Sequence, residues 1–240
     1  MRRLASHKGF SLIELIIVIV ILGVVAVATT QFVRFAMQIY GEGNQRAEQV
    51  AQARFTLLRL EKEIRNAVPN SVAVTGSCLS FFPIKNSGSY ISGATSNLLT
   101  VIDFDGNIAV GDTLLIYPTS VSSVQNNALN IIAVDDQGSD DNLYSLSLSH
   151  VPALRSPGER YYVPESQVEV CLETNAGRQV LMRHQGGVMG VLAVDVNQWR
   201  VQYNAGSLRR NAMVSLFLEL NSPGNERLAL SHEVHIANVP

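Results

Sequence analysis

Apolar side chains fill the N-terminal end of the chain with few interruptions. The run from Phe10 to Ala28 contains only one serine, one glutamate and one glycine among its aliphatic and aromatic residues. Its length suits a helix that spans a membrane. The apolar spacing continues from Gln31 to Ile39 without a glycine or proline. We therefore predict a transmembrane and assembly helix over residues 10–40.

A second helical pattern, which is amphipathic, covers residues 44–68. Its apolar positions recur every three or four residues, and most of the others carry charged or amide side chains. This spacing predicts a helix with one covered face. Asn44 is placed to cap the start of the helix, and Pro69 is placed to end it. Because Gly41-Glu42-Gly43 interrupts the helical spacing, we expect any bend between the two segments there.

The pattern changes to a period of two after Pro69, with short apolar runs separated by Gly, Asn, Asp, Ser and Pro. Such alternation is typical of antiparallel strands. The predicted strands are 79–84, 98–104, 113–117, 128–134, 143–148, 167–172, 179–183, 194–203, 212–220 and 227–237. The sequence thus predicts an α+β fold, in which a long N-terminal helix packs its second half on a β-rich domain over residues 69–240.

The charges around the apolar run predict its orientation. Residues 1–8 carry Arg2, Arg3 and Lys8 without an acid, which favours a cytoplasmic N-terminus and places the chain after Tyr40 outside. An ordinary secretory signal is the alternative, because Ala26-Val27-Ala28 matches the small-x-small cleavage pattern and would give a chain that starts at Thr29. Against this alternative, the apolar run contains a carboxylate and continues as helix beyond the small residues.

The residues that follow the basic stretch, Gly9-Phe10-Ser11-Leu12-Ile13-Glu14, carry a family resemblance. They resemble the class III leader junction of type IV prepilins and type II secretion pseudopilins. The resemblance implies that a prepilin peptidase cuts between Gly9 and Phe10 on the cytoplasmic side and methylates the new amino terminus of Phe10. Residues 1–9 would then be a removed leader, and the apolar helix would stay attached.

Glu14 is a carboxylate within an apolar segment and needs a cation or a proton. No Lys or Arg lies between Phe10 and Gln31, so its partner must come from elsewhere. The resemblance implies that the new amino terminus of an adjacent subunit is this partner, which makes Glu14 an assembly residue. Major pilins of the family carry a proline where this chain has Gln31, and its absence fits a minor pilin or a pseudopilin.

Two further segments refine the resemblance. Residues 54–69 resemble the stem of J-type pseudopilins and of W/O-type minor pilins, and residues 233–240 are similar to the ending of a minor pilin of MSHA (mannose-sensitive haemagglutinin) pilus systems. The resemblance implies a single-pass inner-membrane protein with a periplasmic C-terminal domain, which can become extracellular after assembly. The expected partners are the prepilin peptidase, other minor and major pilins, the inner-membrane assembly platform and membrane lipid. A minor pseudopilin of type II secretion stays as the alternative.

Composition adds few constraints. A formal net charge of -2 with scattered basic residues gives no support to nucleic-acid binding. Cys78 and Cys171 are far apart and outside any C-x-x-C pattern, which argues against zinc, thioredoxin-like and iron-sulfur sites. A disulfide is the natural hypothesis if the domain lies in an oxidising compartment. Two buried free thiols are the alternative.

Catalytic and metal patterns are weak. Cys78 and His184 belong to no local nucleophile motif, so we expect no enzyme and no cofactor. His232 and His235 should lie on opposite faces of one strand and make a poor metal pair. Residues 103–107 fail the EF-hand pattern and predict a hairpin turn. Residues 135–142 hold four carboxylates, which predicts a solvated acidic loop or an oxygen-ligated cation.

A surface-binding module is the remaining alternative from another functional class. Its only aromatic and basic cluster is Tyr161-Tyr162, flanked by Arg155 and Arg160, and a Tyr-Tyr pair in a strand is more often packing. Trp199 lies on an alternating strand and is expected in the core or at an interface. Gly186-Gly187 lacks the strand-to-helix setting of a phosphate loop.

Overall fold

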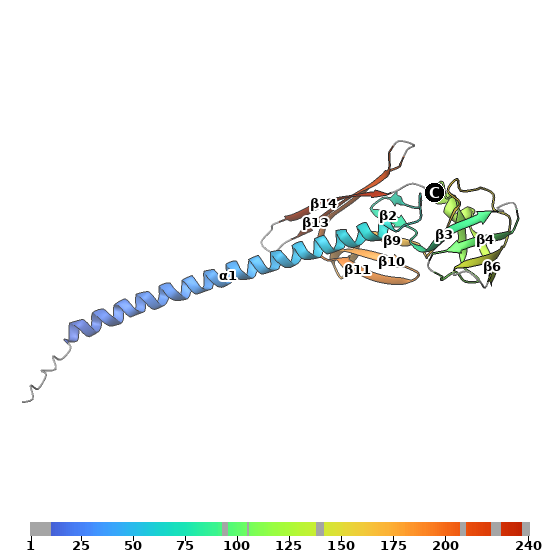
Figure 1. The fold of residues 1–240 in the computed structure, drawn as a ribbon. Coiled ribbons are helices and arrows are strands. Elements are labelled where there is room, and N and C mark those ends of the chain that lie inside the picture. The colour runs from blue at the N-terminus through green and yellow to red at the C-terminus, as the bar shows by residue number, and fades with distance from the viewer. Residues whose placement is uncertain are drawn as a thin grey trace, which may run out of the picture. The chain divides into compact units, whose positions relative to one another are not determined.

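The computed structural model describes residues 11–92, 96–104, 106–137, 142–206, 210–221 and 227–236. The chain forms two compact units, Met1–Glu48 and Gln49–Pro240. A long helix α1 (Leu12–Arg65) is followed by antiparallel strands (Figure 1), so the predicted α+β class is confirmed.

Within the first unit, α1 is helical through Gly41, Gly43 and Asn44. The predicted helix start at Asn44 is therefore wrong, because this residue lies inside one continuous helix. A glycine in a helix costs only about 1 kcal/mol relative to alanine, and helix-forming neighbours carry the hydrogen-bonding pattern past both glycines. Just before them, the Gln38 amide donates to the Glu42 carboxylate over 2.9 Å, one helical turn away.

The second unit contains two sheets packed against the last turns of α1. The first sheet has the order β1-β2-β9-β10-β11 and the second the order β12-β13-β14, and all pairs are antiparallel. Figure 1 shows β13 and β14 on one side of this part of α1, and β10 and β11 on the other. The strands are β1 (Ala73–Thr75), β2 (Cys78–Phe81), β9 (Val168–Asn175), β10 (Arg178–Gln185), β11 (Val188–Ala193), β12 (Val196–Asn204), β13 (Ala212–Asn221) and β14 (Arg227–Ile236).

A closed barrel is inserted between β2 and β9, which pair with each other through Leu79 opposite Val170. Its strand order is β3-β4-β7-β6-β5-β8, and β3 also pairs with β8 to close it. The predicted single sheet domain is thus two sheets and a barrel. The elements of the barrel region are β3 (Ile84–Ser92), β4 (Leu98–Asp103), β5 (Thr113–Ile116), α2 (Val121–Asn126), β6 (Leu129–Asp136), β7 (Leu143–Leu148) and β8 (Arg160–Pro164).

Separate hydrophobic cores support the two parts. One core joins the buried stripe of α1 to both sheets, with Leu60, Leu181 and Leu218 as members, and another fills the barrel around Leu99 and Tyr161. The buried stripe of α1 consists of Ala53, Thr56, Leu57, Leu60 and Ile64. Its spacing of three and four residues is what the amphipathic pattern predicted.

Between the end of α1 and the barrel, the backbone is tied by hydrogen bonds. The Val68 N–H donates to the Phe82 carbonyl over 2.8 Å, and the Ile84 N–H donates to the Asn66 carbonyl over 3.0 Å. The chain that leaves the helix therefore runs beside the chain that enters the barrel.

Ten strands were predicted close to their observed positions, whereas β1, β3, β8, β11 and the short helix α2 were not. The hairpin predicted at residues 103–107 is wrong, because β4 pairs with β3 and β7 while β5 pairs with β6 and β8. The chain turns after Asp103 but crosses to another part of the barrel.

Candidate functional site

The start of α1 carries the first candidate group. The Glu14 N–H lies 3.2 Å from the Ser11 hydroxyl oxygen and 3.1 Å from the Ser11 carbonyl oxygen, and both accept from it. Ser11 therefore caps the helix. The Glu14 side chain lies on the exposed helix surface, and the next basic residue, Arg34, is about 30 Å further along the helix. The proposed cleavage residues Gly9 and Phe10 lie outside the described residues.

The apolar part of α1 is long and apolar enough to cross a membrane. Two hydroxyls within it are bonded to the helix itself, since Thr29 donates to the Val25 carbonyl over 2.9 Å and Thr30 donates to the Val27 carbonyl over 2.8 Å. Such bonds reduce the cost of placing a hydroxyl in lipid. The small-x-small sequence over residues 26–28 lies within this unbroken helix.

Cys78 and Cys171 form a disulfide, as the sequence hypothesis stated. Their Cα atoms are 4.3 Å apart on the paired strands β2 and β9, a separation typical of opposed residues in an antiparallel pair. Both thiols are thereby used, so neither serves as the nucleophile of a hydrolase or as a metal ligand.

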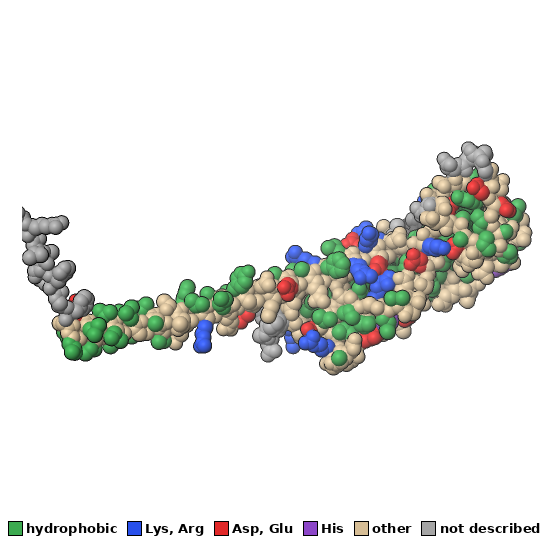
Figure 2. Space-filling view, turned by 90° about the horizontal axis from the view of Figure 1, so that it is seen from below, with side chains coloured by type: hydrophobic (Ala, Val, Ile, Leu, Met, Phe, Trp, Pro, Cys, Tyr) green, Lys and Arg blue, Asp and Glu red, His purple; other side chains and the backbone are tan. Residues whose placement is uncertain are grey.

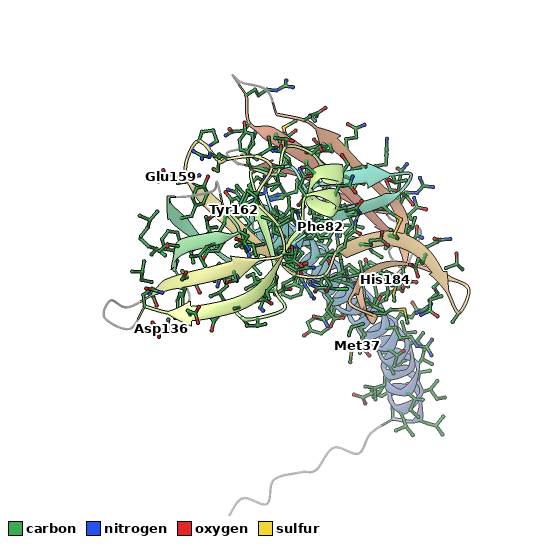
Figure 3. All side chains as sticks on the ribbon, turned by 90° about the vertical axis from the view of Figure 1, so that its right-hand side faces the viewer. Met37, Phe82, Asp136, Glu159, Tyr162 and His184 are labelled. Carbon is green, nitrogen blue, oxygen red and sulfur yellow. A yellow bond between two sulfur atoms is a disulfide. The ribbon has the colours of Figure 1, made fainter. Side chains whose placement is uncertain are left out.

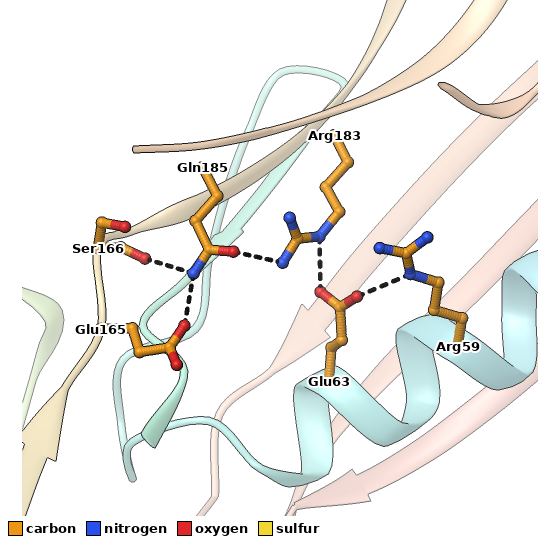
Figure 4. A network of polar contacts seen from close by, with 6 residues as sticks. All are labelled: Arg59, Glu63, Glu165, Ser166, Arg183 and Gln185. Atoms are coloured by element: carbon orange, nitrogen blue, oxygen red, sulfur yellow. Dashed lines mark hydrogen bonds and ion pairs between the residues drawn. The ribbon is translucent and has the colours of Figure 1, made fainter. Parts of the chain in front are cut away.

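A charged network joins the end of α1 to β10 (Figure 4). The Glu63 carboxylate accepts hydrogen bonds from the guanidinium groups of Arg59 and Arg183, each with a nitrogen–oxygen distance of 2.9 Å. Arg183 also donates to the Gln185 amide oxygen over 2.7 Å, and Gln185 donates to Glu165 over 2.8 Å. Of these groups, Arg183 and Glu63 are mostly buried, with 17% and 19% of their side chains exposed.

This network borders a groove of about 970 Å³ beside the last turns of α1. Basic side chains from Arg59, Lys62 and Arg183 alternate on its walls with Glu61 and Glu63. Because the groove carries both signs of charge, and Glu63 pairs with Arg59 and Arg183, it does not select an anionic or a cationic ligand.

Glu61, which also borders this groove, has partners of its own. The Glu61 carboxylate lies 2.6 Å from the imidazole Nε2 of His232 on β14 and 2.9 Å from the guanidinium of Arg65. The hydrogen bond from His232 is the main cause that lowers the pKa of Glu61 below its usual value of 4.5, and Arg65 adds to it. This contact fastens the outermost strand of the second sheet to the helix.

His184 and His232, at strand positions, have structural partners. His232 turns toward α1 while His235 is exposed on the other face of β14, which confirms their predicted separation. His184 bonds the Glu173 carboxylate over 2.6 Å across β9 and β10. In the described part of the chain, no three His, Cys, Asp or Glu side chains gather as a metal site would require.

The two acidic motifs, residues 103–107 and 135–142, differ in what the structure shows of them. Asp103 is buried and its carboxylate accepts the Ile108 N–H over 3.1 Å, so it organises the turn after β4. In the segment 135–142, Asp135 and Asp136 belong to β6 and pair with Ser145 and Tyr144. Residues 138–141 lie outside the described residues, and the cation hypothesis for this loop stays a hypothesis.

The proposed aromatic binding cluster is absent from the described surface. Tyr161 is fully buried inside the barrel, and Tyr162 packs with Val68, Leu115 and Val124. In Figure 3, Tyr162 lies among the packed side chains, whereas Asp136 and Glu159 lie at the periphery. Burial raises the pKa of the Tyr162 hydroxyl, against the opposing effect of Arg160. The Tyr-Tyr pair is therefore packing.

Other sequence predictions hold. Trp199 is buried and its indole N–H donates to the Ser77 carbonyl over 3.0 Å. Gly186 and Gly187 form the tight turn between β10 and β11, with φ of 56° and 82°. Sequence reasoning did not find Thr56, whose buried hydroxyl donates to the Leu192 carbonyl over 2.8 Å. Its only signal was a polar residue within the apolar stripe of α1.

Residues 4–30 match the family described as the prokaryotic N-terminal methylation motif. No curated protein and no solved structure matches the chain. The matched residues include Lys8, the proposed cleavage residues Gly9 and Phe10, Glu14 and the apolar start of α1, whereas Arg2 and Arg3 precede the match. Together with the long apolar helix and the disulfide, this motif supports a type IV pilin-like protein, made as a pilin or pseudopilin precursor.

Proposed function

We propose that the chain is a minor type IV pilin of the MSHA type, akin to the biogenesis protein MshO, which primes or joins filament assembly. It inserts once into the inner membrane, with a cytoplasmic N-terminus and a periplasmic second unit. The observation that carries the proposal is the methylation motif over residues 4–30, set directly on a long apolar helix.

The proposed processing gives Glu14 its partner. Cleavage after Gly9 creates a positively charged amine on Phe10, and the described apolar helix offers no cation near Glu14. The amine of an adjacent subunit then neutralises the carboxylate as the helix leaves the bilayer, and this pairing sets the register between subunits. A subunit whose new amino terminus is blocked, or whose leader is not removed, lacks this contact.

The absence of proline from the helix supports a minor pilin and not a major one. Gln31 occupies the position at which major pilins of the family bend their helix, and α1 is continuous there. A minor pseudopilin of type II secretion shares this feature. Deletion of the gene separates the two functions, since a minor pilin is required for surface pili and a pseudopilin for protein secretion.

In this proposal the chain is a structural assembly protein and catalyses no reaction. Its partners are the prepilin peptidase, other minor and major pilins, the inner-membrane assembly platform and membrane lipid. The second unit then acts as the part that neighbouring subunits contact, and its disulfide fits the oxidising periplasm.

Mass spectrometry of the amino terminus tests the proposal. The full chain is expressed in bacterial membranes with and without a prepilin peptidase. The expected product with the peptidase starts at a methylated Phe10, and without it the chain starts at Met1. Gly9→Leu should block the cut. A chain that keeps Met1 in the presence of the peptidase, or that starts at Thr29, overturns the proposal.

A further inference from the structure

The first turn of α1 is closed by one residue. The Ser11 hydroxyl oxygen accepts a hydrogen bond from the Glu14 N–H over 3.2 Å, and the Ser11 carbonyl oxygen accepts from the N–H groups of Glu14 and Leu15 over 3.1 and 3.2 Å. Ser11 itself is not helical, and α1 begins at Leu12. Ser11 therefore occupies the N-cap position, directly before the helix.

The local sequence specifies the same helix start. Ser11-Leu12-Ile13-Glu14 matches the S-x-x-E pattern, in which a serine caps the helix and an acid follows three residues later. Glu14 is the acidic residue of the first turn, where a negative charge is favourable beside the positive end of the helix dipole. The sequence pattern and the hydrogen bond thus agree on the position of the cap.

The surroundings of the first turn make this cap important. Leu12, Ile13 and Leu15 are 78%, 63% and 55% exposed, and Figure 2 shows hydrophobic side chains around this start of α1. In the proposed function these side chains face lipid, which offers no hydrogen bonds to backbone N–H groups. An acceptor within the chain is therefore needed, and the Ser11 hydroxyl supplies one.

The proposed cut lies next to this cap, because the bond between Gly9 and Phe10 is separated from Ser11 only by Phe10. In the cut, water adds to the Gly9 carbonyl carbon and the bond to the Phe10 nitrogen breaks. The products are the Gly9 carboxylate and the Phe10 amine. Peptidases cleave chain segments that are not held in secondary structure. The cut therefore requires a helix that begins after Phe10.

Gly9 is the competing cap. Glycine caps a helix about as well as threonine, whereas alanine and valine cap it poorly. In a helix capped by Gly9, Phe10 is the first helical residue and the Gly9 carbonyl accepts the first helical hydrogen bond. This is the carbonyl that water must attack. Ser11 and Gly9 therefore compete for the cap, and only the cap at Ser11 leaves the cleaved bond outside the helix.

We infer that Ser11 is a positioning residue for leader removal, because its cap starts α1 after Phe10 and leaves the bond between Gly9 and Phe10 accessible to the peptidase. The inference rests on the proposed function, in which this bond is cut. In this role Ser11 raises the fraction of chains in which the bond precedes the helix. A peptidase that binds only this fraction has an apparent affinity reduced in proportion to it.

Kinetics of the prepilin peptidase on the full chain test the inference. The natural precursor in detergent micelles is compared with Ser11→Ala, which removes the capping hydroxyl and favours a helix through residue 11. Loss of a typical N-cap changes a helix equilibrium about fivefold. KM should therefore rise by a factor between about two and about five, with kcat unchanged.

The matched control is Thr30→Val. It removes a hydroxyl from the same helix, but this hydroxyl donates to the Val27 carbonyl and caps no N–H group. It should leave both KM and kcat unchanged. Protease resistance of the second unit should be equal in all variants, which excludes misfolding as the cause of slower cleavage.

Further substitutions of Ser11 separate capping from recognition of its hydroxyl by the peptidase. Ser11→Asn and Ser11→Gly lack the hydroxyl but keep a residue that caps helices, so KM should stay within about twofold of the natural value. Ser11→Val should resemble Ser11→Ala. If the asparagine and glycine variants lose as much as the alanine variant, the peptidase contacts the hydroxyl and the inference is wrong.

Hydrogen exchange of the Ile13 N–H, followed by nuclear magnetic resonance, reports the helix start directly. In a helix that begins at Leu12, this N–H has no helical acceptor four residues earlier, whereas in a helix capped by Gly9 the Gly9 carbonyl accepts from it. Its exchange should therefore slow in Ser11→Ala. Equal exchange in the natural chain and in Ser11→Ala overturns the inference.

The outcomes separate this inference from the proposed function. A natural chain that is cut after Gly9, together with a Ser11→Ala chain of equal KM, overturns the inference alone. A lower kcat at unchanged KM also overturns it, because it places Ser11 in the chemical step. A natural chain that the peptidase does not cut after Gly9 contradicts the proposed function, and the inference with it.

Discussion

Cys78 and Cys171 lie directly opposite each other on β2 and β9, and their disulfide spans 93 residues that contain the whole barrel. The bond therefore clamps the two chain segments that enter and leave the inserted part. Closing a loop of this length removes much conformational freedom from the unfolded chain.

The double substitution Cys78→Ser with Cys171→Ser should lower the free energy of unfolding by about 3–5 kcal/mol. Chemical unfolding of the full chain in detergent measures this, with the fluorescence of the single Trp199, which is buried in the core shared by α1 and the sheets. The unsubstituted chain with reductant serves as the control and should shift by a similar amount. An unchanged unfolding midpoint would show that the clamp contributes nothing.

How far the fold could be predicted depends on the range of the interactions. Helix and strand periodicity are local, so the helical segments of α1 and strands such as β7, β13 and β14 were predicted well. The pairing of β2 with β9 is not local, because Leu79 and Val170 are joined only after the barrel has formed between them. No pattern along the chain records such a pair, and the inserted barrel was therefore missed.

Individual strands were missed for chemical reasons. β3 reads Ile84-Lys-Asn-Ser-Gly-Ser-Tyr-Ile-Ser92, which contains residues of low strand propensity. Asn86 is fully buried, and Gly88 lies against Ile102 and Tyr161, where a side chain does not fit. For the candidate site, Gly9, Phe10 and Glu14 could be proposed from the sequence because they lie within one short local motif, whereas the bond from Thr56 to Leu192 required the tertiary fold.

Gly88→Ala should disrupt the barrel. A methyl group at this position would lie 2.1 Å from the Ile102 carbonyl oxygen and 2.6 Å from the Tyr161 hydroxyl, and the backbone must move to accept it. We expect the free energy of unfolding to fall by more than about 3 kcal/mol. Chemical unfolding followed by the near-ultraviolet circular dichroism of the tyrosines measures this change. Gly190→Ala is the matched strand control, because nothing lies within 4 Å of its added methyl group. Equal stability of the two variants would contradict the packing around Gly88.

Thr56→Val should destabilise the contact between α1 and β11. Valine keeps the shape of threonine but removes the hydroxyl that donates to the Leu192 carbonyl. The buried carbonyl oxygen then loses this hydrogen bond. The expected loss is about 1–3 kcal/mol in the free energy of unfolding. Thr119→Val, at an exposed position, should change it by less than about 0.5 kcal/mol. If both variants behave alike, the buried hydrogen bond carries no net stability.

Glu63 and Arg183 should be energetically coupled. Their 2.9 Å contact is mostly buried and is extended by Gln185, so removing one partner leaves the other charge poorly compensated. We expect a double-mutant cycle of Glu63→Gln and Arg183→Met to give a coupling of about 1–2 kcal/mol. The exposed pair Arg178 and Asp195, at 3.5 Å, should give less than about 0.5 kcal/mol. Additive effects at Glu63 and Arg183 would mean that the network in Figure 4 is not cooperative.

The contact of Glu61 with His232 should make the attachment of β14 depend on pH. The pKa of Glu61 is lowered in the folded chain, mainly by the hydrogen bond from His232, so the folded state favours the ionised carboxylate. Its stabilising contribution is therefore fully present above the usual value of 4.5 and is lost as the pH falls through the lowered folded pKa. Glu61→Gln should unfold more easily than the natural chain at pH 6, and the difference should shrink below about pH 4.5. Hydrogen exchange of β14 measures the effect where it arises, and Glu233→Gln, on the exposed face of the same strand, is the control. A difference between Glu61→Gln and the natural chain that stays constant from pH 6 to pH 3 would contradict this role of the carboxylate, because a neutral side chain and an ionised one must respond differently to acid.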